Sequence, residues 1–322
     1  MYMTKNSINQ NNTEQWEKDI RESVNSYNDW FLDFAPSTFI EARKEARELV
    51  ELVFQQTKGL EQLSISMLKA VPKATTILRM ITTPPLARDR LGGLSGVSTS
   101  FIGKLEERKW EDGPLQGNSF DEDLEHIVKV IKDYLDLELV PWLDKVDFSD
   151  ESAARLAKDI IIDRVCSAIA NPRIRNEQEN RQKKMIQIFL EGKGYKFVEK
   201  SSIDSAKSMK KGTFTFGLDV PVKKDNNGKF RHMPIDVVIK RKNKKEPLLI
   251  ECKSAGDEAN TNKRRKEEAT KMNQLRETYG NDVEFVLFLG GYFGKSYLEY
   301  EAKAGIDWIW EHRIEDFMKA GV

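Results

Sequence analysis

Two carboxylates and a lysine lie close to the ends of two short apolar runs in the C-terminal half of the chain. The runs are PIDVVIK and PLLIECK, and they carry Asp236 in the first and Glu251 and Lys253 in the second. The basic segment between them contains Asn243, so the pattern predicts a β-hairpin that turns at Asn243 and Lys244. Folding the chain about that turn places Asp236 opposite Glu251, with Cβ atoms roughly 4.5–5.5 Å apart.

This arrangement predicts a metal site. Alternate side chains of a strand point to the same face, so Lys253 joins Glu251 there while Cys252 points to the other face. Two opposed carboxylates repel each other unless positive charge lies between them, and a hard divalent cation with oxygen ligands meets that need. We therefore expect Mg²⁺ to be bound by Asp236 and Glu251, with the carbonyl of Cys252 as a further ligand.

Such a centre suits the hydrolysis of a phosphodiester. The cation neutralises charge on the phosphate and lowers the pKa of the attacking water. Lys253 would act as a positioning base or as an electrophile that stabilises the transition state. An ion-paired, solvated hairpin face is the ordinary alternative. The apolar residues 237–239 and 248–250 favour the catalytic interpretation, because they bury both strands and unpaired charges are costly there.

Two further groups are candidates to serve this centre. Glu179, or Glu177, lies on the helix expected before the hairpin and is a candidate outer carboxylate, with a plain helix-surface charge as the alternative. A basic run on the helix expected after the hairpin would bind backbone phosphates; an exposed helix with i,i+4 ion pairs is its alternative. The run consists of Lys263, Arg264, Arg265 and Lys266.

Residues 83–106 have the spacing of a helix-turn-helix. Gly92 and the segment Gly96-Val97-Ser98 fall where two helices meet closely at a turn. In that frame Gly103 would face the major groove of DNA. With or without this frame, Arg88 and Arg90 are candidates for bidentate contacts with guanine or phosphate. A helix-loop-helix packing unit is equally consistent with the pattern. The other residues expected to face the groove are Thr99, Ser100 and Lys104.

The elements that position these residues fall into two expected regions. Residues 1–170 have mostly helical apolar spacing and form the candidate DNA-recognition and dimerisation part. Asn171-Pro172 ends that region, because proline disfavours a helical residue before itself. The second region, 171–322, contains a helix, four β-like runs, a long charged helix and two further strands, and its core follows the order α-β-β-β-α-β. The expected ranges are 176–191, 195–199, 213–222, 233–240, 248–253, 257–279, 284–290 and 306–310.

That order resembles the common core of the PD-(D/E)XK nucleases. The expected fold is therefore α+β, with a helical N-terminal region followed by a restriction-endonuclease-like core in which helices flank a mixed sheet. The formal charge is zero, with 52 basic against 52 acidic residues, so no global excess indicates a nucleic-acid partner. The distribution indicates more, because residues 200–280 carry twenty Lys and Arg against eleven Asp and Glu.

The cysteines and the hydropathy exclude several classes of protein. Cys166 and Cys252 stand far apart, and the chain has only three histidines, which argues against a zinc module or a disulfide framework. A reducing cytoplasm fits this composition. No window has the apolar length of a signal peptide or a membrane span, so we expect neither export nor membrane insertion.

Stretches along nearly the whole chain resemble the XamI-type restriction endonucleases. They are YNDWFLDFAP, LRMITTPPLARDRLGGLSGVS, NPRIRNEQENRQ, IECKSAGDEANTNKRRKEEATKMNQL and GYFGKSYLEYEAKAGIDWIWEHRIEDF. The resemblance implies Mg²⁺-dependent type II cleavage of double-stranded DNA at a short palindrome, leaving 5′-phosphate and 3′-hydroxyl ends. It places Asp236, Glu251 and Lys253 on the family's catalytic positions. GTCGAC, the target of the family's namesake, is the sequence it suggests.

The resemblance also implies partners. A palindrome cut in both strands suits a homodimer, and a cognate DNA methyltransferase is expected to protect host DNA without forming a stable complex. Two other interpretations stay open at this point. One is a repair or junction-resolving nuclease built on the same core. The other is a non-catalytic DNA-binding regulator that uses the helix-turn-helix segment, against which the intact acidic pair and lysine argue.

Overall fold

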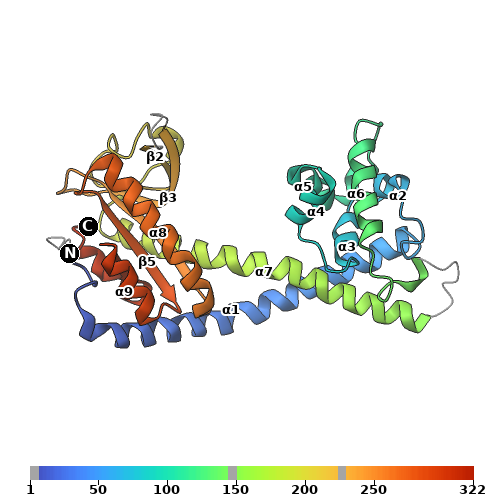
Figure 1. The fold of residues 1–322 in the computed structure, drawn as a ribbon, viewed down its shortest axis with the longest axis horizontal. Helices are drawn as coiled ribbons and strands as arrows, with labels where there is room; N and C mark the ends of the chain where they lie inside the picture. Colours follow the sequence, from blue (N-terminus) through green and yellow to red (C-terminus); the bar gives the residue numbers. More distant parts are fainter. Residues whose placement is uncertain (1–6, 144–150, 224–229) are drawn as a thin grey trace. The chain divides into compact units, whose positions relative to one another are not determined.

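A computed structural model describes residues 7–143, 151–223 and 230–322 (Figure 1). By its contacts the chain divides into two units, Met1–Phe34 with Arg175–Val322, and Ala35–Ile174. The boundary expected between residues 170 and 171 falls inside one helix, α7 (Glu151–Gly192). The N-terminal segment belongs to the same unit as Arg175–Val322, which we call the first unit. The DNA-recognition and dimerisation role assigned to the helical region stays a prediction.

The first unit is built on a mixed β-sheet of six strands in the described chain, arranged in sequence order. The pairs β2/β3 and β3/β4 are antiparallel, whereas β1/β2, β4/β5 and β5/β6 are parallel. This confirms the α+β fold class. The strands are β1 (Lys196–Phe197), β2 (Thr213–Lys223), β3 (Phe230–Lys240), β4 (Leu248–Ala255), β5 (Glu284–Gly291) and β6 (Asp307–Trp310).

Helices cover the sheet on two sides (Figure 1). One apolar cluster joins Leu249 and Leu287 to α8 (Glu258–Tyr279) and α9 (Lys295–Lys303). A second cluster joins Ile250 to Ile186 of α7. Consecutive residues 249 and 250 thus serve opposite faces, as the alternation of a strand requires. Helix α9 was not predicted from the sequence.

The second unit is helical around one apolar core. It contains parts of two long helices, α1 and α7, and a set of shorter ones between them. A pair of these, α4 and α5, is joined at Gly96, whose φ of 72° is the left-handed conformation that glycine adopts without strain. The helices before α7 are α1 (Thr13–Gln56), α2 (Ile65–Ala70), α3 (Ala74–Met80), α4 (Arg88–Ser95), α5 (Thr99–Glu107) and α6 (Asp121–Asp133).

The expected break at Asn171-Pro172 is wrong. Helix α7 continues through Pro172 from residue 151 to residue 192. A proline inside a helix removes one backbone hydrogen bond and costs about 3 kcal/mol. Apolar side chains are buried both before and after the proline, as at Val165 and Leu190, each with 0% exposure. Packing of this kind holds a helix against an unfavourable local residue.

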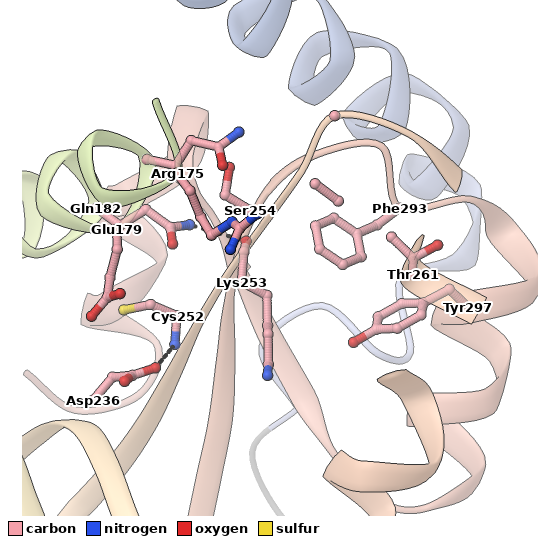
Figure 2. A pocket seen from close by; sticks show the side chains of 13 residues that line it. Arg175, Glu179, Gln182, Asp236, Cys252, Lys253, Ser254, Thr261, Phe293 and Tyr297 are labelled. Carbon is pink, nitrogen blue, oxygen red and sulfur yellow. Dashed lines mark hydrogen bonds between the residues drawn. The ribbon is translucent and has the colours of Figure 1, made fainter. Parts of the chain in front are cut away.

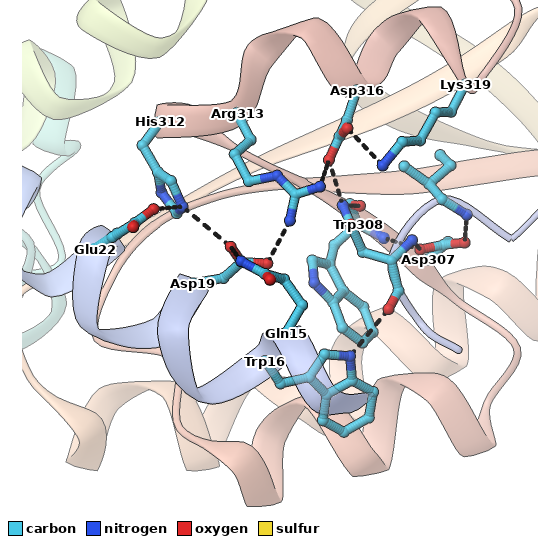
Figure 3. Close-up of polar contacts among 12 residues, drawn as sticks. Gln15, Trp16, Asp19, Glu22, Asp307, Trp308, His312, Arg313, Asp316 and Lys319 are labelled. Atoms are coloured by element: carbon cyan, nitrogen blue, oxygen red, sulfur yellow. Dashed lines mark hydrogen bonds and ion pairs between the residues drawn. The ribbon is translucent and has the colours of Figure 1, made fainter. Parts of the chain in front are cut away.

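The N-terminal segment is anchored in the sheet unit by polar contacts (Figure 3). The carboxylate of Asp307 on β6 accepts hydrogen bonds from the backbone N–H groups of Asn9 and Gln10, at 2.8 and 3.0 Å. The indole of Trp16 donates to the carbonyl of Asn9 and packs edge-on against Trp308. These contacts explain why residues from the start of the chain belong to this unit.

No helix among residues 7–143, 151–223 and 230–322 combines the length and the apolar character needed to cross a membrane.

Candidate active site

The β3–β4 hairpin has the register that the sequence predicts. Val237 pairs with Ile250, so the next position outward places Asp236 beside Glu251. The backbone N–H of Cys252 donates a 2.8 Å hydrogen bond to the Asp236 carboxylate. The two acidic side chains are therefore brought together by strand pairing, which is a rigid way to hold them.

Lys253 forms an ion pair with Glu251, the more deeply buried carboxylate of the two. Its Nζ lies 3.1 Å from Oε1 of Glu251, and that same oxygen is 2.5 Å from Nζ of Lys271 on α8. Glu251 is 6% exposed. Burial by itself lowers the pKa of Lys253, but neighbouring carboxylates, with Glu251 first among them, outweigh burial and raise that pKa above its ordinary value.

The pKa of Asp236 is shifted by its surroundings in the site. Burial and then the negative charge of Glu251 raise the pKa of Asp236 above its ordinary value. The Cys252 N–H and the ammonium groups of Lys183 and Lys253 act in the opposite direction. Two carboxylates that repel each other in a buried place are favourable binders of a cation.

A divalent cation fits this donor set. Oε2 of Glu251 is buried and has no hydrogen-bond partner within the described chain. Asp236 supplies a second carboxylate of raised pKa on the adjacent strand, and hard cations such as Mg²⁺ take oxygen ligands of this kind. The assignment of the Cys252 carbonyl as a third ligand stays a prediction.

Helix α7 forms one wall of the site. Its Gln182 is 1% exposed and donates hydrogen bonds to the carbonyls of Lys253 and Phe288, at 3.0 and 3.2 Å. Glu179 is exposed and pairs with Lys183 at 2.5 Å. The carboxylate of Glu179 lies on the same cleft as Asp236, as its expected role requires, whereas Glu177 is not among the residues of that cleft.

The cleft has a volume of about 540 Å³ and opens beside these groups (Figure 2). In the view of Figure 2, Asp236, Cys252 and Glu179 lie to one side of Lys253, and Tyr297 of α9 lies to the other. Cationic and neutral polar side chains both reach it, which suits a phosphate-bearing substrate. Other lining residues are Arg175, Gln178, Ser254, Thr261 and Phe293.

The expected helix-turn-helix segment does form two short helices with a tight turn, α4 and α5. A Cβ at Gly92 would lie 3.0 Å from the carbonyl oxygen of Val97, so the close approach of the two helices depends on glycine there. Gly103 is buried, because the Arg88 guanidinium lies over it, so its expected place facing the groove is wrong. Among the residues expected to contact DNA, Arg90, Thr99, Ser100 and Lys104 are exposed.

Arg88 is occupied by neighbouring acids. Its Nε lies 2.8 Å from the buried carboxylate of Glu106, which also binds Arg79 at 2.5 Å. Burial lowers the pKa of Arg88, but Glu106 and Glu107 outweigh it and raise that pKa. Arg90 is exposed, with no ion pair found for it in the described chain. Arg90 is thus the better placed of the two for contact with a ligand.

The basic run lies on α8, the helix that follows β4. The side chains of Lys263, Arg264 and Arg265 lie outside the described residues, and Lys266 is exposed. Its role in binding phosphates stays a prediction.

A separate group of ligand atoms is formed by Asp19, Glu22 and His312, within 4.8 Å of one another (Figure 3). Asp19 is already bound to Arg313 at 2.7 Å and to Gln15 at 3.1 Å. These contacts join α1 to the C-terminal segment, so we interpret the group as an anchor between the two.

Sequence reasoning missed Gln182 and Lys183, which approach the hairpin from α7, and Lys271, which approaches it from α8. A weak signal existed. Lys271 lies on α8 one residue before the buried Met272, so a predicted helix packed on β4 would bring it near Glu251. Gln182 and Lys183 gave no such signal, because their approach depends on how α7 crosses the sheet.

Comparisons with known proteins found a matching family, a similar enzyme and a matching solved structure. A profile of the XamI restriction endonuclease family matches residues 58–310. The chain is 42% identical over 323 aligned residues to the type II restriction enzyme SalI of Streptomyces albus G, covering 98% of this chain and 99% of that protein. Among solved structures, protein VC1899 of Vibrio cholerae matches with a TM-score of 0.27 and 13% identity over 84% of this chain, which spans 56% of that protein. That structural likeness is too low to carry an argument.

Proposed function

The chain belongs to the XamI restriction endonuclease family, and from this premise we propose that it cuts both strands of DNA at a short palindrome with Mg²⁺ as cofactor. The products would carry 5′-phosphate and 3′-hydroxyl ends. GTCGAC is the sequence to test first. The observation that carries the proposal is the pairing of the half-buried Asp236 with the buried Glu251, which has Lys253 beside it.

Each residue of the site has a proposed role. Asp236 and Glu251 would hold the cation, which supplies positive charge to the phosphate and acidifies the attacking water. Lys253 would place its ammonium group beside the phosphate and stabilise charge that develops there. Gln182 fixes the end of β4 through the Lys253 carbonyl. Glu179 stays a candidate outer carboxylate on α7.

The test is digestion of unmethylated phage DNA by the purified protein with Mg²⁺, followed by sequencing of the ends. We expect discrete fragments with one shared terminal sequence and no cleavage in EDTA. Cleavage confined to branched or damaged DNA would favour the repair or junction-resolving alternative. No cleavage of any DNA would overturn the proposal.

Variants assign the reaction to this site. Asp236→Asn, Glu251→Gln and Lys253→Met should each lower the cleavage rate by about 100-fold or more while DNA is still bound. Asp219→Asn is a matched control, since Asp219 is an exposed carboxylate on the adjacent strand β2. Near-normal cutting by any of the three site variants would remove that residue from the mechanism.

Protection of host DNA calls for a partner activity. We propose a methyltransferase that modifies the same target, acting on DNA separately from this chain. Methylating the target before digestion should block cleavage.

A further inference from the structure

Glu268 is a buried carboxylate that the proposed reaction leaves unused. It lies on α8 and is 0% exposed. Thr261, seven residues earlier, and Met272 and Leu275, four and seven residues later, are also buried. This spacing places all four on the inner face of the helix. A carboxylate on such a face is costly unless a cation compensates it.

The cation that does so is Lys253. Its Nζ lies 2.8 Å from Oε1 of Glu268 and 3.1 Å from Oε1 of Glu251. The ammonium group is thus held from two directions, by a carboxylate of its own strand and by one on α8. Oε2 of Glu268 has no hydrogen-bond partner within the described chain. The ion pair with Lys253 therefore accounts for the position of Glu268.

Glu251 and Glu268 differ in their contacts and in their proposed roles. Glu251 also binds Lys271 and is the proposed ligand of the metal ion. Glu268 lies deeper and pairs with Lys253 alone among the ion pairs of the described residues. Replacing a buried ion pair with apolar residues is often neutral or stabilising, so folding stability gives little reason for a carboxylate here. The need to orient Lys253 does explain a carboxylate at this position.

We propose that Glu268 is a positioning residue that holds the ammonium group of Lys253 on the Asp236/Glu251 face, aimed at the phosphate to be cleaved. This inference rests on the proposed function. Glu268 touches neither the substrate nor the metal; it acts through Lys253, as the third member of a catalytic group orients the second. Side chains of long, flexible lysines need such a contact to keep one direction.

The experiment compares Glu268→Gln and Glu268→Asp with the wild type in single-turnover cleavage. The affinity for the same duplex is measured with Ca²⁺ in place of Mg²⁺. Glu268→Gln keeps the size of the side chain and removes its charge, so the rate should fall about 100-fold while Kd changes less than about threefold. Glu268→Asp keeps the charge and should recover about tenfold of that loss. The matched control is Glu267→Gln, the neighbouring exposed carboxylate on α8, which should cleave like the wild type.

A Glu268→Gln rate within about threefold of wild type would overturn the inference. Equal rates for Glu268→Asp and Glu268→Gln would do the same, because a purely structural role does not distinguish the charge. If wild type itself fails to cleave, the proposed function fails with it; a cleaving wild type with an unaffected Glu268→Gln refutes only the positioning role.

A thermal-unfolding cycle tests the pair even where a variant folds poorly. Lys253→Met leaves Glu268 buried without its cation and should lower Tm. Adding Glu268→Leu removes that uncompensated charge and should raise Tm again, to the wild-type value or above. If Glu268→Leu lowers Tm by the same amount in both backgrounds, the two side chains are not coupled and the inference is wrong.

Discussion

Arg88 and Arg90 lie two residues apart on α4, yet their surroundings differ and indicate different roles. Arg88 shares the buried Glu106 with Arg79, whereas Arg90 is exposed. An arginine that compensates a buried acid stabilises the fold, and an exposed one remains available to a guanine edge or a phosphate. Sequence spacing alone treated the two as equals.

Arg90→Ala should therefore weaken binding to the cognate site by about 1–3 kcal/mol and leave Tm unchanged. Arg88→Ala should lower the free energy of unfolding by roughly 1–3 kcal/mol instead, because Glu106 keeps one of its two cations. Affinities for cognate and scrambled duplexes, measured beside urea unfolding, separate the effects. If Arg90→Ala weakens both duplexes equally, α4 contacts phosphates and the bases are read elsewhere.

A second residue-scale prediction concerns acid stability. Burial raises the pKa of Glu284, but hydrogen bonds from Arg241 and Lys244 outweigh burial and hold that pKa below its ordinary value of 4.5. Arg241 is fully buried and Glu284 is its ion-pair partner on β5. For a carboxyl with a lowered folded pKa, the stabilisation is present above the ordinary value and is lost as the pH falls through the folded value.

Glu284→Gln should thus lower stability by about 1 kcal/mol at neutral pH, a small value because a third of the side chain is exposed to screening water. Below the ordinary pKa of 4.5 the difference from wild type should shrink. Urea unfolding at neutral pH and at two pH values on either side of that pKa checks both points, with the exposed Glu277→Gln as control. A difference that stays constant across these pH values would contradict the assigned pKa direction.

At the scale of elements, the sequence predicts the hairpin well and the packing around it poorly. Two apolar runs and a basic turn suffice to set the β3–β4 register, because a slip by one residue would turn every side chain to the wrong face. Glu268 and Lys183 reach the same centre from α8 and α7. Their approach depends on how these helices cross the sheet, which the period of a single helix does not encode.

Two other elements show the same limit. The proline in α7 carries a local signal for a break, and the tertiary packing of the helix overrides it. Helix α9 is short, so its nine residues give too few turns for a clear apolar period. Local patterns therefore predict strands and turns in this chain, whereas long-range contacts decide where helices continue.

Helix α8 carries the element-scale prediction. If its basic run clamps phosphates, Lys266→Ala should weaken binding to all duplexes alike and reduce the salt slope by about one unit, because one phosphate is no longer neutralised. Lys303→Ala removes the same charge from an exposed lysine at the end of α9 and is the matched control. Affinities are measured over a series of salt concentrations. Equal slopes for Lys266→Ala and wild type would show that this lysine does not bind a phosphate.

At the scale of the whole molecule, the number of active sites sets the stoichiometry on DNA. The chain supplies one Asp236/Glu251 pair, and a palindrome presents two scissile phosphates related by a two-fold axis. A homodimer with the same symmetry brings one site to each strand. A monomer would have to release the duplex and bind it again in the opposite orientation before the second cut.

We therefore expect two copies of the chain per cognate duplex in sedimentation velocity, measured with the inactive Glu251→Gln variant so that the DNA stays intact. Supercoiled plasmid should pass to linear product with little nicked intermediate, because both strands are cut in one binding event. Mixing wild type with an excess of Glu251→Gln should raise the nicked fraction, since mixed dimers cut one strand only. One copy per duplex, together with unchanged linear product in the mixture, would contradict the dimer and require each chain to cut both strands in turn.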